Sequence, residues 1–334
     1  MSCAGGHKAD STQSRAYLSS FEVRRFYYGF HPNFFCWNLF FQDCDLAVAS
    51  TGHSSAFFAD DLHAYKVYER TTSLDAITQD CENCRVSVHR WGEANQVVFD
   101  GDKESVHVLS QHSGVASSFK FLGCVLDSRL QMQELITDLT TNCNWKIASI
   151  LRVRRFHSTL DLINLYKAQI LGYIEYRTGA LYHAGACHLE PLDLLQTKFL
   201  HSIGVSIADA LLTYNLAPLG TRRDMALLGL IHKCAIGGGP PHFKQFFSRA
   251  AGTTMLLNPY SQPPFVFGPF RRTSALLTNS AVGLIPVYNS LAEFQRRAET
   301  VPDFQGYLQE YIKSQCRIGL VRWDKSLCPR HFGR

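Results

Sequence analysis

Residues 55–65 read Ser-Ala-Phe-Phe-Ala-Asp-Asp-Leu-His-Ala-Tyr, so that apolar runs stand on both sides of two adjacent carboxylates. The two phenylalanines favour a strand, Asp60 and Asp61 favour a turn, and residues 62–65 can return as the partner strand. The stretch therefore predicts an antiparallel hairpin with both aspartates at its tip.

Two carboxylates at such a tip repel one another unless a cation lies between them, and Mg²⁺ is the hard cation that suits oxygen ligands. Chemistry that uses such a site is typically phosphoryl or nucleotidyl transfer. The competing interpretation is a surface turn with two solvated aspartates. The residues of the turn alone do not distinguish a metal site from such a surface turn.

The sequence around this turn resembles a known family. Phe58-Ala59-Asp60-Asp61 is similar to the aromatic-Ala-Asp-Asp box of reverse transcriptases from retrotransposons that lack long terminal repeats. Five further segments follow the order of that family across roughly residues 14–185. They are 37–43 (WNLFFQD), 95–99 with 103–105 (NQVVF and KES), 119–127 (FKFLGCVLD), 165–169 (LYKAQ) and 173–177 (YIEYR).

The resemblance implies an α+β fold with an incomplete polymerase palm, an antiparallel hairpin with helices, followed by a mainly helical thumb and extension. The expected parts are a disordered N-terminus (1–13), a partial palm (14–115), a primer grip and thumb (116–185), and a helical extension (186–334) with a Pro/Gly-rich linker (237–286).

The resemblance also implies site residues and partners. Asp60 and Asp61 would be catalytic and would hold Mg²⁺, and Lys103 would protonate or neutralise the departing pyrophosphate. The partners would be an RNA template with a DNA primer, or a hybrid duplex. The remaining roles are a template- and nucleotide-contacting helix with Trp37 and Asn38, a primer grip of Phe121, Leu122 and Gly123, and backbone contacts from Arg152, Arg154, Arg155 and Lys167.

Some of these positions have simpler interpretations. Lys103 lies between Asp102 and Glu104, as a solvated lysine in a turn would. The Arg152 to Arg155 cluster suits the backbone of a duplex, and it equally suits a solvated helix end.

Two departures from the family concern catalysis. Residues 29–36 run directly into Trp37, where the family has a Gln-Gly stretch and a longer linker. Residues 14–28 resemble the strand that follows the family's first catalytic aspartate. Only Asp10 precedes them, without a strand pattern, and we reject it as that aspartate. We expect the first catalytic aspartate and the fingers to be absent.

Composition bounds the class of protein. The 334 residues are 46% hydrophobic, and the net charge of +5 combines −5 over residues 1–115 with +10 over the rest. The eleven cysteines do not have the regular spacing of a disulfide framework. They therefore predict a protein of a reducing compartment, the nucleus or the cytoplasm, that contains no disulfides. We expect no signal peptide and no membrane span. The oligomeric state is left open.

Helical periodicity covers much of the chain. Residues 74–91 repeat apolar side chains at spacings of three and four after possible caps at Thr72 and Ser73. Cys81 and Cys84 fall on that stripe, which favours core packing over zinc, and Cys316, Cys328 and His331 match no common metal site. Residues 130–156, 158–181, 186–235 and 290–317 also predict helix, with a capping box at residues 158–161.

The leading hypothesis is therefore a reverse-transcriptase-like protein, truncated and inactive alone, whose family adds deoxynucleotides to a primer on an RNA template with Mg²⁺. The alternative is a non-catalytic nucleic-acid-binding remnant of such a polymerase. A chain without a biochemical role ranks third.

Overall fold

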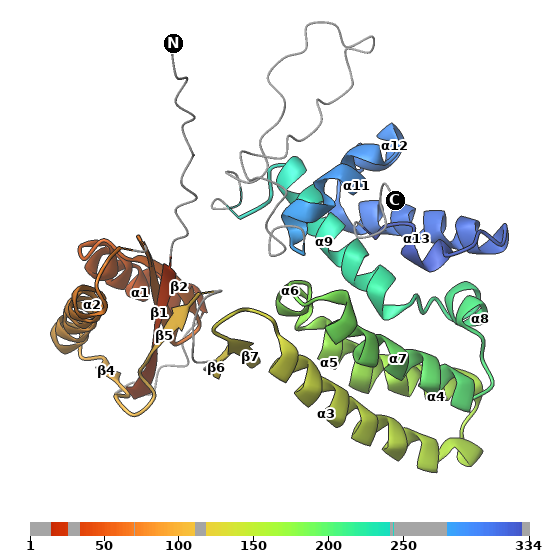
Figure 1. The fold of residues 1–334 in the computed structure, drawn as a ribbon, viewed down its shortest axis with the longest axis horizontal. Coiled ribbons are helices and arrows are strands. Elements are labelled where there is room, and N and C mark those ends of the chain that lie inside the picture. Colours follow the sequence, from red (N-terminus) through yellow and green to blue (C-terminus); the bar gives the residue numbers. More distant parts are fainter. Residues whose placement is uncertain are drawn as a thin grey trace, which may run out of the picture. The chain divides into compact units, whose positions relative to one another are not determined.

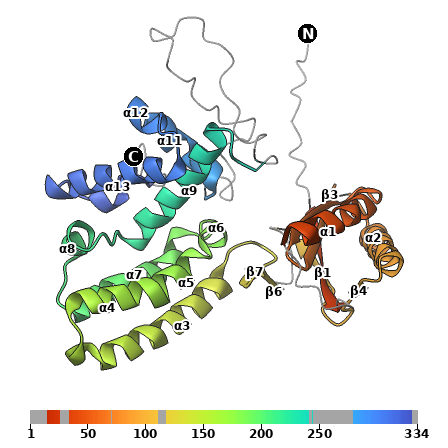
Figure 2. The ribbon, with the colours of Figure 1, turned by 180° about the vertical axis from the view of Figure 1, so that it is seen from behind.

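The computed structural model describes residues 15–25, 34–69, 71–110, 118–240, 243 and 279–328, with side chains from residue 39 onward. The fold is mixed α+β (Figures 1 and 2). The predicted disordered segment 1–13, His331 and most of the predicted linker lie outside the described residues. The chain divides into an N-terminal unit, Met1–Phe119 with Asp127–Leu130, and a C-terminal unit, Lys120–Leu126 with Gln131–Arg334.

The N-terminal unit contains a five-stranded antiparallel sheet, in which β3 lies between β2 and β1. The opposite edge of β1 pairs with β5 along one part and with β4 along another. With the helices, the order is the β-α-β-β-α-β arrangement of the split βαβ motif. The bounds are β1 (Arg15–Arg25), α1 (Phe34–Ala49), β2 (Ser54–Phe58), β3 (Asp61–Tyr68), α2 (Leu74–Ala94), β4 (Val98–Phe99) and β5 (Ser105–Leu109).

Helices α1 and α2 pack together on one face of this sheet. The core that they share with β3 contains Phe41, Leu62, Cys84, Val88 and Trp91, all buried. Helix α2 begins where the sequence predicts, because the Ser73 hydroxyl accepts a hydrogen bond from the backbone N–H of Ala76 at 3.3 Å. The apolar stripe of α2 therefore provides the cover that one face of the sheet requires.

A polar network ties α2 to the end of β3 that lies away from the aspartates. Asp80 accepts hydrogen bonds from Lys66 at 2.5 Å and from Tyr68 at 2.7 Å. Burial opposes ionisation of Asp80, but these two hydrogen bonds outweigh it and lower the carboxyl pKa. The Tyr68 hydroxyl also lies 3.3 Å from Nε2 of His53, whose pKa burial lowers. We interpret this network as structural.

The two units meet in sequence at a second hairpin, formed by β6 (Ser118–Phe121) and β7 (Cys124–Asp127). The C-terminal unit is otherwise helical. Its bounds are α3 (Gln133–Arg152), a 3₁₀ turn (Arg154–Phe156), α4 (Thr159–Tyr166), a π-helical segment (Lys167–Leu171), α5 (Gly172–Glu175), α6 (Thr178–Leu181), α7 (Ala186–Ser202), α8 (Ile207–Leu212), α9 (Leu219–Ala235), a 3₁₀ turn (Ala281–Leu284), α11 (Ile285–Ser290), α12 (Glu293–Arg296), α13 (Val301–Arg317) and a 3₁₀ turn (Trp323–Lys325).

The structure corrects three predictions of secondary structure and confirms one predicted cap. Residues 290–317, predicted as one helical piece, contain the end of α11 and the separate helices α12 and α13. Residues 281–286, predicted as the end of an irregular linker, form a 3₁₀ turn and the start of α11, because Pro286 stands in the first turn of a helix, where proline is tolerated. Residues 186–235 form three helices instead of one, because Gly204 and Asn215 adopt positive φ angles of 72° and 54°. Both residue types tolerate this left-handed conformation, which ends a helix. The predicted capping box is present, since Ser158 and Asp161 satisfy each other's backbone N–H groups.

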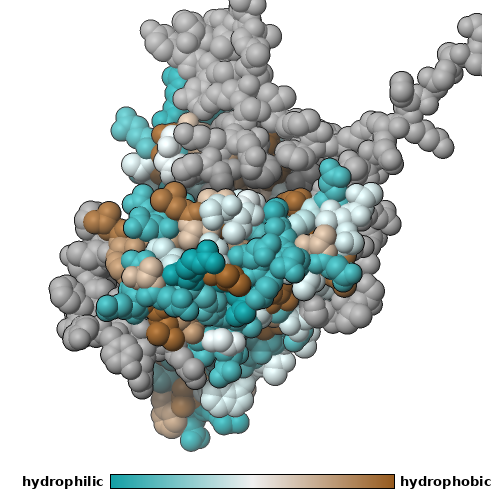
Figure 3. Space-filling model, turned by 90° about the vertical axis from the view of Figure 1, so that its left-hand side faces the viewer, coloured by the Kyte–Doolittle hydropathy of each residue, from teal (hydrophilic) through white to brown (hydrophobic). Residues whose placement is uncertain are grey.

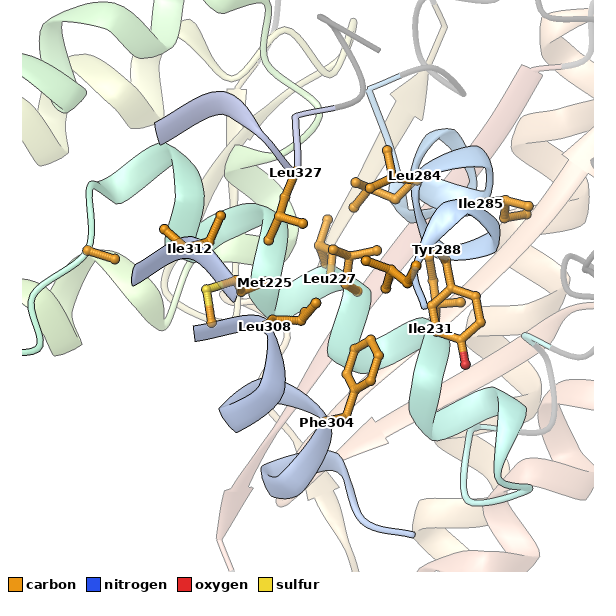
Figure 4. Packing of buried hydrophobic residues seen from close by; sticks show 14 of the residues in the cluster. Met225, Leu227, Ile231, Leu284, Ile285, Tyr288, Phe304, Leu308, Ile312 and Leu327 are labelled. Atoms are coloured by element: carbon orange, nitrogen blue, oxygen red, sulfur yellow. The ribbon is translucent and has the colours of Figure 1, made fainter. Parts of the chain in front are cut away.

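One buried cluster of the C-terminal unit joins α9, α11 and α13, and Figure 4 shows the side chains meeting between these helices. His232 of α9 lies inside it with no exposed surface, and its ring stacks on Phe304 at 4.2 Å between centroids. His232 donates from Nε2 to the Ala298 carbonyl at 2.9 Å, and Nδ1 accepts from the Tyr288 hydroxyl at 3.0 Å. Burial lowers the His232 pKa, in keeping with a neutral ring.

The cysteines behave as the periodicity predicts. Cys81 and Cys84 are buried on the inner face of α2, Cys316 is buried on α13, and each cysteine whose side chain the structure describes is a free thiol. Over the same residues, none of the helices combines the length and the apolar character that crossing a membrane requires. Among the coloured residues in Figure 3, hydrophilic ones surround scattered hydrophobic ones, as is usual for a surface.

Candidate functional site

The two aspartates lie at the tip of the β2–β3 hairpin, as predicted. Phe58 pairs with Asp61 across the hairpin, so that the loop consists of Ala59 and Asp60. Ala59 has a φ of 55°, a left-handed conformation that costs a non-glycine residue roughly 1 kcal/mol. The Asp60 side chain is exposed, whereas Asp61 is half-buried as the first residue of β3.

A third carboxylate residue stands beside this tip in the backbone register. Glu22 of β1 pairs with Asp61 of β3, although the side chains of β1 are outside those that the structure describes. The sequence gives no sign of this pairing, because it does not reveal which strand lies next to which. Asp45, another carboxylate near the sheet, accepts a hydrogen bond from Ser55 near the start of β2, away from the tip.

Lys103 lies in the tight turn between β4 and β5, where its backbone N–H donates to the Asp100 carbonyl at 2.9 Å, and its side chain is exposed. Before this turn, β4 pairs with Val23 of β1, and after it β5 pairs with Ser20 of β1. Both positions are close to Glu22, the residue of β1 that pairs with Asp61. The lysine turn and the aspartate turn therefore lie at the same end of the sheet, roughly 10 Å apart across β1 at about 4.8 Å per strand.

The donor set at the aspartate turn has the right chemistry for Mg²⁺, which prefers carboxylate oxygens. Within the described part of the chain, however, no three His, Cys, Asp or Glu side chains come together in a way that could hold a metal ion. A two-metal clamp needs carboxylates on both sides of the metal pair. The described side chains supply carboxylates from one hairpin only, so these carboxylates do not complete a two-metal centre.

The predicted primer-grip residues form the tip of the β6–β7 hairpin. Leu122 and Gly123 are its two loop residues, with φ angles of 45° and 75°, and two successive positive φ angles are the geometry of a type I′ turn. The Tyr176 hydroxyl donates to the Leu122 carbonyl at 3.0 Å, and Arg177 donates to the Gly123 carbonyl at 3.3 Å. The segment 173–177, predicted as a thumb helix, thus holds the hairpin tip.

Cation–π packing reinforces the contacts that the segment 173–177 makes with the hairpin tip. The Tyr173 ring has the Lys146 ammonium and the Arg177 guanidinium each 4.2 Å from its centroid. This arrangement fixes the direction of the Arg177 side chain toward the hairpin. The sequence contains both segments, but nothing in it indicates that they meet.

The left-handed Leu122 gives a testable consequence for the stability of the hairpin. We expect Leu122→Asn to raise the free energy of unfolding of the C-terminal unit by about 1 kcal/mol, because asparagine adopts a positive φ more readily. That gain corresponds to a melting temperature roughly 2–4 °C higher. Differential scanning calorimetry measures it on the transition in which the C-terminal unit unfolds, with Gly123→Ala as the control that should lower the midpoint of that transition. A loss of stability in Leu122→Asn would show that packing of the leucine outweighs the strain.

The basic cluster lies where α3 ends. Arg152, Arg154 and Arg155 are all exposed. Arg154 donates to the carbonyl of Ser202 at 3.3 Å, at the last residue of α7, where a cation is favourable. Arg152 and Arg155 are therefore the better candidates for phosphate contacts.

Lys167 is placed differently from those arginines. Its ammonium donates to the Tyr214 carbonyl at 2.5 Å, and burial, with help from nearby Arg222, lowers its pKa. This ammonium is engaged inside the helical unit. Trp37 and Asn38 lie within α1, which agrees with the predicted helix, but their side chains are outside the described set.

Comparison with known proteins identifies no relative. No family model, curated protein or solved structure matches this chain.

Proposed function

We propose that this chain is a reverse-transcriptase-like protein that binds an RNA template paired with a DNA primer. The observation that carries the proposal is the register of the N-terminal sheet. It puts the Asp60–Asp61 turn and the Lys103 turn at one end of the sheet, on the two sides of β1. Carboxylates and a lysine at one end are the groups that nucleotidyl transfer uses.

The C-terminal unit supports the binding part of the proposal. Its hairpin tip accepts hydrogen bonds from Tyr176 and Arg177, which fix where the tip lies within this unit. Arg152 and Arg155 are exposed and can contact phosphates, which dominate the affinity of such complexes. In this proposal the chain's own residues hold and orient the hybrid.

A second function, binding without catalysis, is favoured by the incomplete carboxylate set among the described side chains. It shares the hybrid as ligand and differs only in the absence of nucleotidyl transfer. Both functions predict the same binding behaviour, and template-dependent extension in the primer-extension assay described in the Discussion would exclude the second.

Binding to a labelled RNA–DNA hybrid tests the proposal. We expect the association constant to fall steeply as salt rises, because phosphate contacts release counterions. The double variant Arg152→Gln with Arg155→Gln should flatten the slope of log K against log salt by up to roughly two units, about one for each arginine that no longer neutralises a phosphate. Fluorescence anisotropy at several salt concentrations measures it.

A matched control is available in the same unit. Arg317 occupies the last turn of α13, as Arg152 does in α3, and Arg322 is exposed beyond it. The double variant Arg317→Gln with Arg322→Gln should leave the slope unchanged. Equal slopes in both double variants would remove the cluster from the interface, and no binding by the unmodified chain would overturn the proposal.

A further inference from the structure

The solvent face of α3 and the turn after it carry two large aromatic side chains in the open. Trp145 and Phe156 are each 71% exposed. The opposite face of α3 is buried through residues such as Leu135, Leu139 and Ile147, so Trp145 has no place in that core. Two exposed rings of this size in one stretch, on a helix that is well packed on its other side, make this stretch a candidate binding surface.

The position of Trp145 relative to the basic cluster is set by the helix. Arg152 follows it by seven residues, two turns on, so both lie on one face about 10.5 Å apart. The residues between them on that face, Ala148 and Ser149, are small. The Trp145 ring and the Arg152 guanidinium thus lie on either side of a part of the helix surface that carries only small side chains.

The second ring is already paired with a cation. The guanidinium of Arg155 lies 4.7 Å from the centroid of the Phe156 ring. One face of this ring is covered by the guanidinium, a planar group on which a base can also stack. Ring and cation together form a second contact point beside the end of α3.

Charge indicates the kind of partner. Residues 139–160 contain four Lys or Arg residues and no Asp or Glu, whereas Glu134 and Asp138 lie in the first half of α3. Only the C-terminal half of the helix therefore favours a polyanion. Aromatic rings interleaved with arginines are the pattern by which proteins hold single strands, with bases on the rings and phosphates on the cations.

We propose that Trp145, Arg152, Arg155 and Phe156 form a binding surface for an unpaired nucleic-acid strand. In a duplex the faces of the bases are covered by their neighbours, so rings on a protein surface find partners only where the strand is unpaired. The inference rests on the proposed function and refines it, because it adds an unpaired segment, stacked on the two rings, to the hybrid whose phosphates Arg152 and Arg155 contact. RNA and DNA share the chemistry that the surface recognises.

The test measures binding of the full chain to 20-nucleotide oligo(U), to 20-nucleotide oligo(dT) and to a 20-base-pair RNA–DNA hybrid. Trp145→Ala and Phe156→Ala should each weaken single-strand binding roughly tenfold, with the hybrid unaffected. Neither change removes a charge, so the salt slope should stay the same. Trp145→Phe keeps a ring and should restore most of the affinity.

Phe294→Ala is the matched control, since Phe294 is 64% exposed on α12 in the same unit. It should leave every affinity unchanged. If Trp145→Ala and Phe156→Ala bind single strands as tightly as the unmodified chain while the hybrid still binds, this inference is wrong and the proposed function stands. If neither hybrid nor single strands bind the unmodified chain, the proposed function itself fails. A preference for oligo(U) over oligo(dT), or the reverse, would identify the natural strand.

Discussion

A DNA primer annealed to an RNA template is expected to remain unextended when the purified chain is supplied with deoxynucleotides and Mg²⁺. The described side chains offer Asp60 and Asp61 from one turn and no three ligands that could hold a metal ion. When several groups act together in catalysis, removing one of them lowers the rate nearly as much as removing all of them. The loss is on the order of 10⁴-fold in kcat. Positioning supplies most of the acceleration in this chemistry, so a loosely held ion cannot compensate.

The assay runs with Mg²⁺ and separately with Mn²⁺, and Asp60→Ala is the control variant. Template-dependent extension that disappears in Asp60→Ala would prove this prediction wrong. Another carboxylate would then complete the centre, and three variants would locate it. Glu22→Gln tests the residue in register with Asp61, while Asp43→Asn and Asp45→Asn test the two aspartates of α1.

The second large effect is on stability. Phe304→Ala is expected to lower the free energy of unfolding of the C-terminal unit by about 3–5 kcal/mol, the usual range for a buried phenylalanine. Phe304 is completely buried, its ring stacks on His232, and the Tyr288 ring lies 5.7 Å away. Figure 4 shows Phe304 and Tyr288 within the same cluster. The cavity would open inside the cluster that joins α9, α11 and α13.

Phe294→Ala is the matched control, because the same truncation at a side chain that is 64% exposed should cost less than about 1 kcal/mol. The chain has two units and is not expected to unfold in one step. Hydrogen exchange is therefore the suitable measurement. Amides of α9 and α13 should lose protection in Phe304→Ala while those of α1 and α2 keep it, and equal losses in both variants would contradict the packing described above.

Local patterns in the sequence predicted much of the fold. The hairpin at Asp60 and Asp61 follows from apolar runs around two turn formers, and α2 follows from a stripe that begins after Ser73. The capping box at Ser158 and the packing of Cys81 and Cys84 were also predicted. Each of these features depends on residues close together in the chain, where propensity and periodicity act directly.

Contacts between segments far apart in the chain were decided only by the tertiary structure. The sequence contains the strand that became β1, but its position between β3 and the edge of β4 and β5, with Glu22 in register with Asp61, depends on pairings that no local pattern encodes. The same holds for Tyr176 on the Leu122 carbonyl and for Lys167 on Tyr214. The physical reason is that periodicity specifies which face of an element is apolar, whereas the partner of that face, and of each polar group left over, is selected by packing of the whole chain.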